Sequence, residues 1–223
     1  MKRQDSISEK VAVLGTGAVG SRLGALFAAA GHEVVYGARD PKSVAAPLGG
    51  SPQVVDYATA VRNATIVVLA VPYAGASGSV AADVLAQAGP FQGKILVDAT
   101  NPLAADWSPL RLVDTSAAEQ LAKAAPEANI VKAFNTVFAD VMTAEGLVFD
   151  GGQRPSVFVC GDDAGARARV GALAASAGFE PVDAGPLANS RYVEAMAHLN
   201  IQLAVALGGG TQAVFRYVRR RSA

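Results

Sequence analysis

Residues 11–20 read Val-Ala-Val-Leu-Gly-Thr-Gly-Ala-Val-Gly, an apolar strand that runs directly into a glycine-rich turn and then a helix. Each glycine of this turn has its own physical reason. Gly15 allows the tight turn, Gly17 lets a phosphate approach the backbone, and Gly20 lets the helix pack closely on the strand. The free N–H groups at the helix start then attract anions. The segment therefore predicts a site for a dinucleotide pyrophosphate.

The surroundings of the motif make it specific. A helical pattern follows over 18–30, Gly31 is a good helix stop, and 33–36 supplies a second apolar run. Strand, turn, helix and strand together predict a β-α-β unit. The residues expected at the pyrophosphate are Gly15, Thr16, Gly17, Ala18, Val19 and Gly20.

The end of the second predicted strand bears on the choice of cofactor. A free ribose 2′-hydroxyl is usually held by Asp or Glu about 20 residues after the first glycine. This chain has Ala38 and Arg39 there, followed by Lys42 and Ser43. Because Arg grips phosphate bidentately, these residues favour NADP(H) over NAD(H). Asp40 could contact a ribose hydroxyl, so dual use stays open, as does a plain surface role for the two cations.

Further apolar runs alternate with helical patterns along the chain. Continuous apolar runs are typical of parallel strands covered on both faces, and their alternation with helices predicts a doubly wound α/β fold. Strands are expected at 54–55, 65–71, 94–98 and 129–133, helices at 57–62 and 75–87, and a third helix after the capping box Ser116-x-x-Glu119.

The last third of the chain predicts one more strand, helix and strand, then a final helix over 190–207. That helix is apolar on nearly every side, so it needs burial by a homodimer contact or within the chain. Helix capping explains Asp162 and Asp163 better than a metal site does. We expect a disordered leader over 1–9, a Rossmann domain over 10–150, and a small α/β extension over 151–223 in the same globule.

Composition narrows the functional classes. With 19 basic and 19 acidic side chains, nothing draws the protein to nucleic acid or to anionic lipid. The polar N-terminus lacks a signal peptide and 199–210 is too short to span a bilayer, which predicts a cytoplasmic protein. One cysteine, Cys160, excludes an internal disulfide and a Cys-based metal site, and it reads as a buried small hydrophobe.

Ligands of open α/β sheets lie beyond the carboxyl ends of the strands. Three loops follow such ends, and each offers backbone amides and small polar groups, although each can also be an ordinary turn. Their candidate residues are Ala70, Val71, Pro72 and Tyr73 in the first loop, Asn101 and Pro102 in the second, and Phe134, Asn135 and Thr136 in the third. Val71, Pro72, Asn135 and Thr136 are expected to position the reacting rings.

Conventional acid-base residues are scarce. His32 and His198 are the only histidines, and both are better read as structural. Carbonyl reduction usually needs a proton donor, whereas hydride transfer to a flavin-like ring mainly needs two rings held about 3 to 3.5 Å apart. Charge on the acceptor could be met by backbone amides, for instance after 183–187.

Several segments together resemble the NADPH-dependent reductases of the deazaflavin coenzyme F420. They are residues 15–20, 37–39, 71–73, 131–136, 160–163 and 183–194. The resemblance implies a homodimer in which the nicotinamide of NADP(H) stacks on the deazaflavin. It also implies the 2′-phosphate near Arg39 with Lys42 or Ser43, and the nicotinamide near Val71, Pro72 and 134–136.

Two positions depart from the archaeal deazaflavin enzymes. Asn135 stands where they have His, and Ala38 stands where they have Ser beside the phosphate-binding Arg. The run 132–136, Lys-Ala-Phe-Asn-Thr, is also similar to the cytoplasmic domain of six-transmembrane ferric reductases, which use an ordinary flavin. The acceptor expected is thus F420, FMN or FAD. Two alternatives stay open: a non-catalytic NADP-binding module, and a reductase of small carbonyls or imines.

Overall fold

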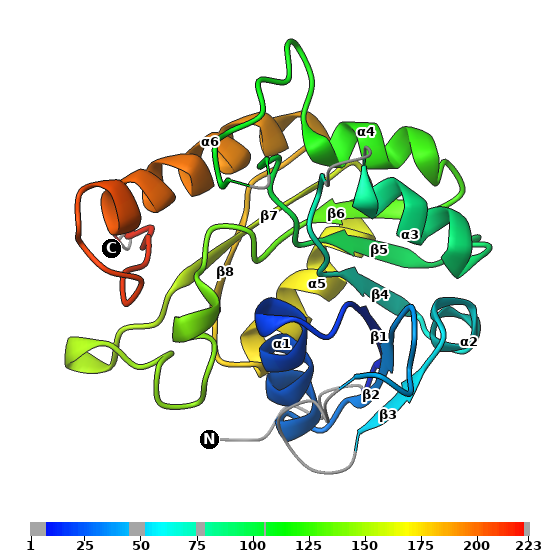
Figure 1. The fold of residues 1–223 in the computed structure, drawn as a ribbon. Helices are drawn as coiled ribbons and strands as arrows, with labels where there is room; N and C mark the ends of the chain where they lie inside the picture. Colours follow the sequence, from blue (N-terminus) through cyan, green and yellow to red (C-terminus); the bar gives the residue numbers. More distant parts are fainter. Residues whose placement is uncertain (1–7, 45–51, 75–78, 105, 221–223) are drawn as a thin grey trace.

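The computed structural model (Figure 1) describes residues 8–44, 52–74, 79–104 and 106–220. One sheet contains eight strands in the order β3-β2-β1-β4-β5-β6-β7-β8. The strands are β1 Lys10–Leu14, β2 Glu33–Gly37, β3 Gln53–Val55, β4 Ile66–Leu69, β5 Ile95–Asp98, β6 Asn129–Lys132, β7 Ser156–Gly161 and β8 Glu180–Asp183. The order reverses between β1 and β4, which is where ligands bind in such sheets. The predicted Rossmann-like α/β fold is confirmed.

Helices cover both faces of this sheet (Figure 1). They are α1 Ala18–Ala29, α2 Tyr57–Arg62, α3 Val80–Ala88, α4 Ala117–Ala124, α5 Ala164–Ser176 and α6 Ser190–Ile201, the last extended by a π-helical turn at Gln202–Ala206. Along β1, Val11 and Val13 belong to the core cluster that contains residues of α1 and α5. Ala12 and Leu14 belong to the cluster that contains residues of α2, α3 and α4. Side chains alternate across a strand, so a strand buried on both faces reads as a continuous apolar run.

All neighbouring strands are parallel except β6 and β7, which pair antiparallel. The reversal follows the long irregular connection over 133–155, which contains two 3-10 turns, Ala139–Val141 and Asp150–Gly152. β7, α5 and β8 then form another parallel unit. The predicted extension over 151–223 thus continues the same sheet.

Some predicted boundaries shift. The helix expected from 75 begins at Val80, where the Ser79 side chain accepts a hydrogen bond from Ala82 N–H; residues 75–78 lie outside the described ranges. Most of the predicted leader, 1–7, also lies outside them. Its last residue, Glu9, is held in place by two hydrogen bonds from Arg169 of α5. Within the described part of the chain, no helix has the length and apolar character needed to cross a membrane.

Candidate functional site

The glycine turn after β1 meets its predicted requirements in three different ways. Gly15 has φ +110°, and a Cβ there would collide with the carbonyl oxygen of Ala70. A Cβ on Gly20 would collide with the carbonyl oxygen of Gly15. By contrast, a Cβ on Gly17 would meet nothing within 4 Å. The fold itself therefore requires two of these glycines, while Gly17 leaves space that a ligand can use.

The helix that follows has unused donors at its start. Gly17 is the N-cap of α1, no side chain caps the helix, and its first turn holds no acidic residue. Helices α3, α4 and α5 are instead capped by Ser79, Ser116 and Asp163. A helix start left uncapped beside open space suits an anionic ligand. These residues fit the pyrophosphate of a dinucleotide.

The corner after β2 gathers the predicted phosphate-binding side chains in one turn. Ala38 is buried and its N–H donates to Val55. Arg39, Lys42 and Ser43 follow at the exposed surface. The Asp40 carboxylate accepts the Lys42 N–H at 3.1 Å, so it shapes the turn.

Two adjoining cavities open at the carboxyl ends of the strands. The smaller, about 350 Å³, is lined by Gly17, Ala70, Val71, Pro72, Tyr73 and Thr100 among others. The larger, about 550 Å³, is lined by Asn135, Thr136, Val137, Phe138, Asn200 and Ile201 among others. Both are lined by Ala18, Val19, Asn101, Leu103 and Trp107. The structure thus brings the glycine turn and residues of all three predicted loops to one continuous site.

Two predicted residues lie elsewhere. The Phe134 ring points into the core and packs edge-to-face on Phe27 and Phe179, at centroid distances of 5.8 and 5.5 Å. Its backbone has φ 65°, a strained conformation that turns the chain toward the cavity at the next residue. Pro102 lines a separate groove beside His198. For both residues, the side chain is away from the two cavities.

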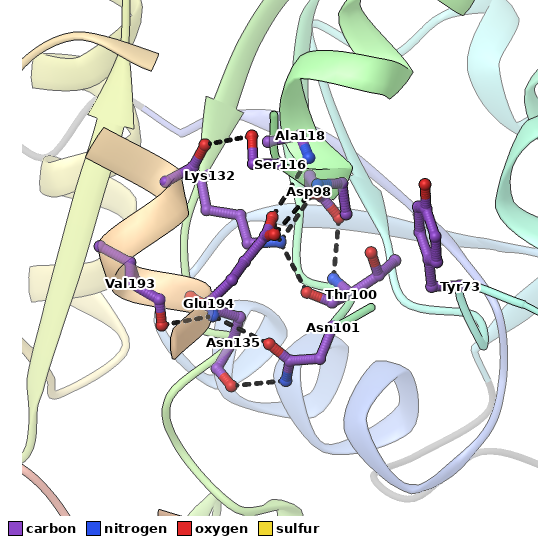
Figure 2. A network of polar contacts seen from close by, with 12 residues as sticks. Tyr73, Asp98, Thr100, Asn101, Ser116, Ala118, Lys132, Asn135, Val193 and Glu194 are labelled. Atoms are coloured by element: carbon purple, nitrogen blue, oxygen red, sulfur yellow. Dashed lines mark hydrogen bonds and ion pairs between the residues drawn. The ribbon is translucent and has the colours of Figure 1, made fainter. Parts of the chain in front are cut away.

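Two asparagines join the second and third loops (Figure 2). Asn135 Nδ2 donates to Asn101 Oδ1 at 3.0 Å and to the Val193 carbonyl at 3.2 Å, while Asn101 Nδ2 donates to the Asn135 carbonyl at 2.8 Å. This pairing leaves Asn135 Oδ1 buried with no hydrogen-bond partner among the described residues, and Thr100 Oγ1 is in the same state. Thr100 lines the smaller cavity and Asn135 the larger one. Buried polar atoms are nearly always satisfied, so one unpaired atom at each of the two adjoining cavities fits bound polar ligands.

A buried ion network lies beneath these loops (Figure 2). Lys132 Nζ, at the end of β6, is 2.8 Å from Asp98 Oδ2 on β5 and 3.0 Å from Glu194 Oε1 on α6. It also donates to the Thr100 carbonyl at 2.6 Å, and Asp98 Oδ1 accepts the Thr100 N–H at 2.8 Å. The network therefore clamps the loop that carries Thr100 and Asn101.

Glu194 adds the start of α4 to this network. Its two carboxylate oxygens accept the N–H groups of Ala117 and Ala118 at 3.0 and 3.2 Å. Burial opposes the charge of Lys132, but the attraction of Asp98 and Glu194 outweighs it and raises the pKa of Lys132. The pair of carboxylates is balanced by one ammonium and one helix N-terminus. Sequence reasoning missed this network because its members lie in three separate segments.

Both histidines and the cysteine line neither cavity. His32 Nδ1 accepts the Glu9 N–H and its Nε2 lies 2.8 Å from Ser176 Oγ. Burial lowers the pKa of His198. Cys160 is fully buried, as predicted, and burial raises the pKa of its thiol to about 11. Among the described residues, no cluster of His, Cys, Asp or Glu could hold a metal ion.

Two predictions near the last strand need correction. Asp163 caps α5 as predicted, accepting the Ala166 N–H at 2.6 Å. Asp162 does not cap that helix: it accepts the Leu187 N–H at 2.9 Å. The Gly185 N–H donates to Asp183. These amides are already used and line neither cavity, so they do not serve an acceptor ring.

Comparison with known proteins identifies the family. The profile of the family described as NADP oxidoreductase, coenzyme F420-dependent, matches residues 10–102. The crystal structure of a candidate F420-dependent NADP reductase from Arthrobacter sp. FB24 superimposes with a TM-score of 0.83 at 33% identity, over 95% of this chain and all of that one. This chain belongs to the F420-dependent NADP oxidoreductase family.

Two other proteins are similar to this chain over part of their length or in fold alone. Metalloreductase STEAP3 of Rattus norvegicus is 36% identical over 188 residues, which are 84% of this chain and 36% of that protein. The chain thus spans about a third of that relative. A reductive aminase from Aspergillus terreus, bound to NADPH and ethyl levulinate, has a TM-score of 0.64 at 17% identity over 90% of this chain and 63% of the other. That likeness shows a shared fold alone.

Proposed function

We propose that this member of the family is an NADP(H)-dependent oxidoreductase that moves hydride between the nicotinamide and a deazaflavin or flavin ring. The observation that supports this proposal most is the continuous site. The cavity lined by Gly17 adjoins a larger one, and both are lined by Ala18, Val19, Asn101, Leu103 and Trp107. A nicotinamide bound from the glycine turn therefore has room beside it for a second ring. When bound, the nicotinamide supplies or takes up the hydride.

The chain's own residues would bind and orient the cofactor. Backbone donors at the start of α1 hold the pyrophosphate, and Arg39 with Lys42 and Ser43 holds the 2′-phosphate. Val71 and Pro72 flank the nicotinamide, while Thr100 Oγ1, in the same cavity lining, is a buried group left to hydrogen-bond it. The ion network keeps the loop that carries Thr100 in place.

The character of the larger cavity favours a ring acceptor over a small carbonyl or imine. Its charged lining residues are Asp106 and Asp140, both exposed. Asp140 is already paired with Arg22 and Thr211. The described lining contains no Lys, His or Tyr that could donate a proton to a developing alkoxide. A ring that carries its own conjugated acceptor does not need such a donor.

The test is steady-state oxidation of NADPH with F420, FMN, FAD and a quinone offered in turn. We expect turnover with F420 or a flavin. Tight NADPH binding without turnover of any acceptor favours the non-catalytic module. Turnover restricted to small ketones or imines favours the third hypothesis.

The outer face of α6 supports a homodimer. Leu199, Leu203 and Leu207 are exposed there, while Val193 and Ala197 face the core. A second copy of the chain would cover these leucines. Analytical ultracentrifugation of the protein and of Leu203→Glu tests this, with a shift from dimer to monomer expected in the variant.

A further inference from the structure

The mouth of the site carries one large exposed aromatic side chain. Trp107 is the chain's single tryptophan, and 64% of it is exposed. It lines both cavities, in the connection between β5 and α4. An indole has a large flat surface that gains most by covering another flat ring. Because Trp107 lines both cavities, its exposed indole is available to a flat ligand ring in the site.

The backbone around Trp107 is held firmly. Trp107 has φ 67°, a conformation that a bulky residue rarely adopts. Its N–H donates to the Ala104 carbonyl at 3.0 Å, and the Ala104 N–H donates to the Ser108 carbonyl at 2.9 Å. The Asp106 carboxylate accepts both the N–H and the hydroxyl of Ser108. These bonds hold the backbone of Trp107 and of its described neighbours, which reduces the entropy lost when a ligand stacks on the indole.

The larger cavity, which Trp107 lines, matches a flat ring that carries an N–H donor. Its lining includes the apolar side chains of Val137, Ile201 and Val205. It also includes Asn135, which is only 6% exposed and whose Oδ1 lacks a partner among the described residues. The described lining includes Asp106 and Asp140 but no basic side chain. An uncharged heteroaromatic ring suits these walls, and a phosphate does not.

We propose that Trp107 is the stacking surface for the planar ring of the hydride acceptor, and that it selects fused aromatic acceptors over small ones. This inference rests on the proposed function and names a specificity-determining residue for it. The indole would cover one face of the ring while the apolar wall contacts its edges. Any charged tail of the acceptor would remain outside the cavity.

The kinetic test compares Trp107→Phe and Trp107→Leu, with riboflavin as acceptor because it is a fused ring without phosphate. Loss of the aromatic face in the leucine variant should raise the KM for riboflavin roughly tenfold, whereas phenylalanine should keep it within about threefold. The dissociation constant for NADPH should change less than about twofold in both, since the cofactor keeps its other contacts. Tyr217→Leu changes an exposed aromatic side chain that lines neither cavity, so it is the matched control and should leave both constants unchanged.

A binding test uses the fact that all indole fluorescence comes from Trp107. Riboflavin added to protein saturated with NADP⁺ should quench that emission by more than half, after correction against free tryptophan at the same absorbance.

The outcomes separate the two claims. An unchanged riboflavin KM in Trp107→Leu, with normal turnover, overturns the stacking role and leaves the proposed function standing. An equal loss of NADPH affinity in that variant also overturns it, because the indole would then cover the cofactor. If the wild type turns over no acceptor, the proposed function fails, and unquenched indole emission then overturns the stacking role as well.

Discussion

The two ends of the site are built on opposite principles. At the glycine turn, recognition uses bare backbone from residues 15–20, with Gly17 open to the surroundings. At the other end, the loops are held by Asp98, Lys132 and Glu194, charged side chains that are almost completely buried. The first end leaves its backbone donors free for a ligand, and the second pairs its charged side chains with one another. Changes at the first should therefore cost affinity, and changes at the second should cost stability.

The largest effect is expected from Lys132→Met. Removing the ammonium leaves Asp98 and Glu194 buried without their common partner, which should cost about 3–5 kcal/mol of unfolding free energy. Urea denaturation measures this. The exposed Lys123 of α4 supplies the control: Lys123→Met should stay within about 0.5 kcal/mol of wild type.

A deficit of Lys132→Met below about 1 kcal/mol relative to wild type contradicts the assigned role of the network.

The next effect compares two glycines of the same turn. Gly17→Val should lower the affinity for NADPH and NADH by at least roughly 100-fold, about 2.7 kcal/mol, with an unchanged Tm, because its side chain enters open space that a ligand needs. Gly20→Val should lower the Tm, because its Cβ collides with the Gly15 carbonyl. Isothermal titration measures the cofactor affinity, and thermal melts measure the Tm. Retained affinity in the first variant removes the turn from the cofactor site.

A smaller and more selective effect is expected at the corner after β2. Arg39→Glu should lose a charge-assisted contact of about 1.5–3 kcal/mol, roughly a 10- to 150-fold weaker binding of NADPH. Binding of NADH should change only a few-fold, since it lacks the 2′-phosphate. The exposed Arg62→Glu serves as the charge control. Equal losses for both cofactors would refute the phosphate assignment.

The smallest effect compares two helix caps. Ser116 is fully buried, caps α4, and lies 2.7 Å from Ser190 Oγ, whereas Ser79 caps α3 at a half-buried position. Ser116→Ala should cost about 2 kcal/mol and Ser79→Ala about 1 kcal/mol, because only the first leaves other buried groups without a partner. Chemical denaturation resolves this difference. Equal costs would show that the contact between Ser116 and Ser190 adds nothing to the cap.

The predictability of each part follows from how far apart its residues lie in the chain. The glycine turn, the alternation of strands and helices, and the capping Ser116 arise from neighbouring residues with a fixed spacing, so the sequence predicts them. The ion network joins β5, β6 and α6, and Lys132 reads in the sequence as an ordinary end of a strand. A polar residue at the end of an otherwise apolar strand, seen at both Asp98 and Lys132, was the available signal.

Two single residues also differ from what the sequence predicts. Phe134 was expected at the cofactor because its loop follows a strand end, but its strained backbone sends the ring into the core and turns Asn135 to the cavity. Asp162 was expected to cap a helix because Asp precedes helices so often. It bonds Leu187, which is 25 residues away. Neither outcome is encoded in residue type or spacing.

Helix α6 lies between the site and the exposed leucines. Toward the site it supplies the Val193 carbonyl to Asn135, and Asn200 Nδ2 donates to the Thr136 carbonyl at 3.1 Å. The opposite side of the helix carries the exposed leucines. About 10 Å, the thickness of a single helix, therefore separates the contacts to Asn135 and Thr136 from any protein that binds to the leucines. If binding of such a protein changes the affinity for the ligand by some factor, binding of the ligand must change the affinity for that protein by the same factor.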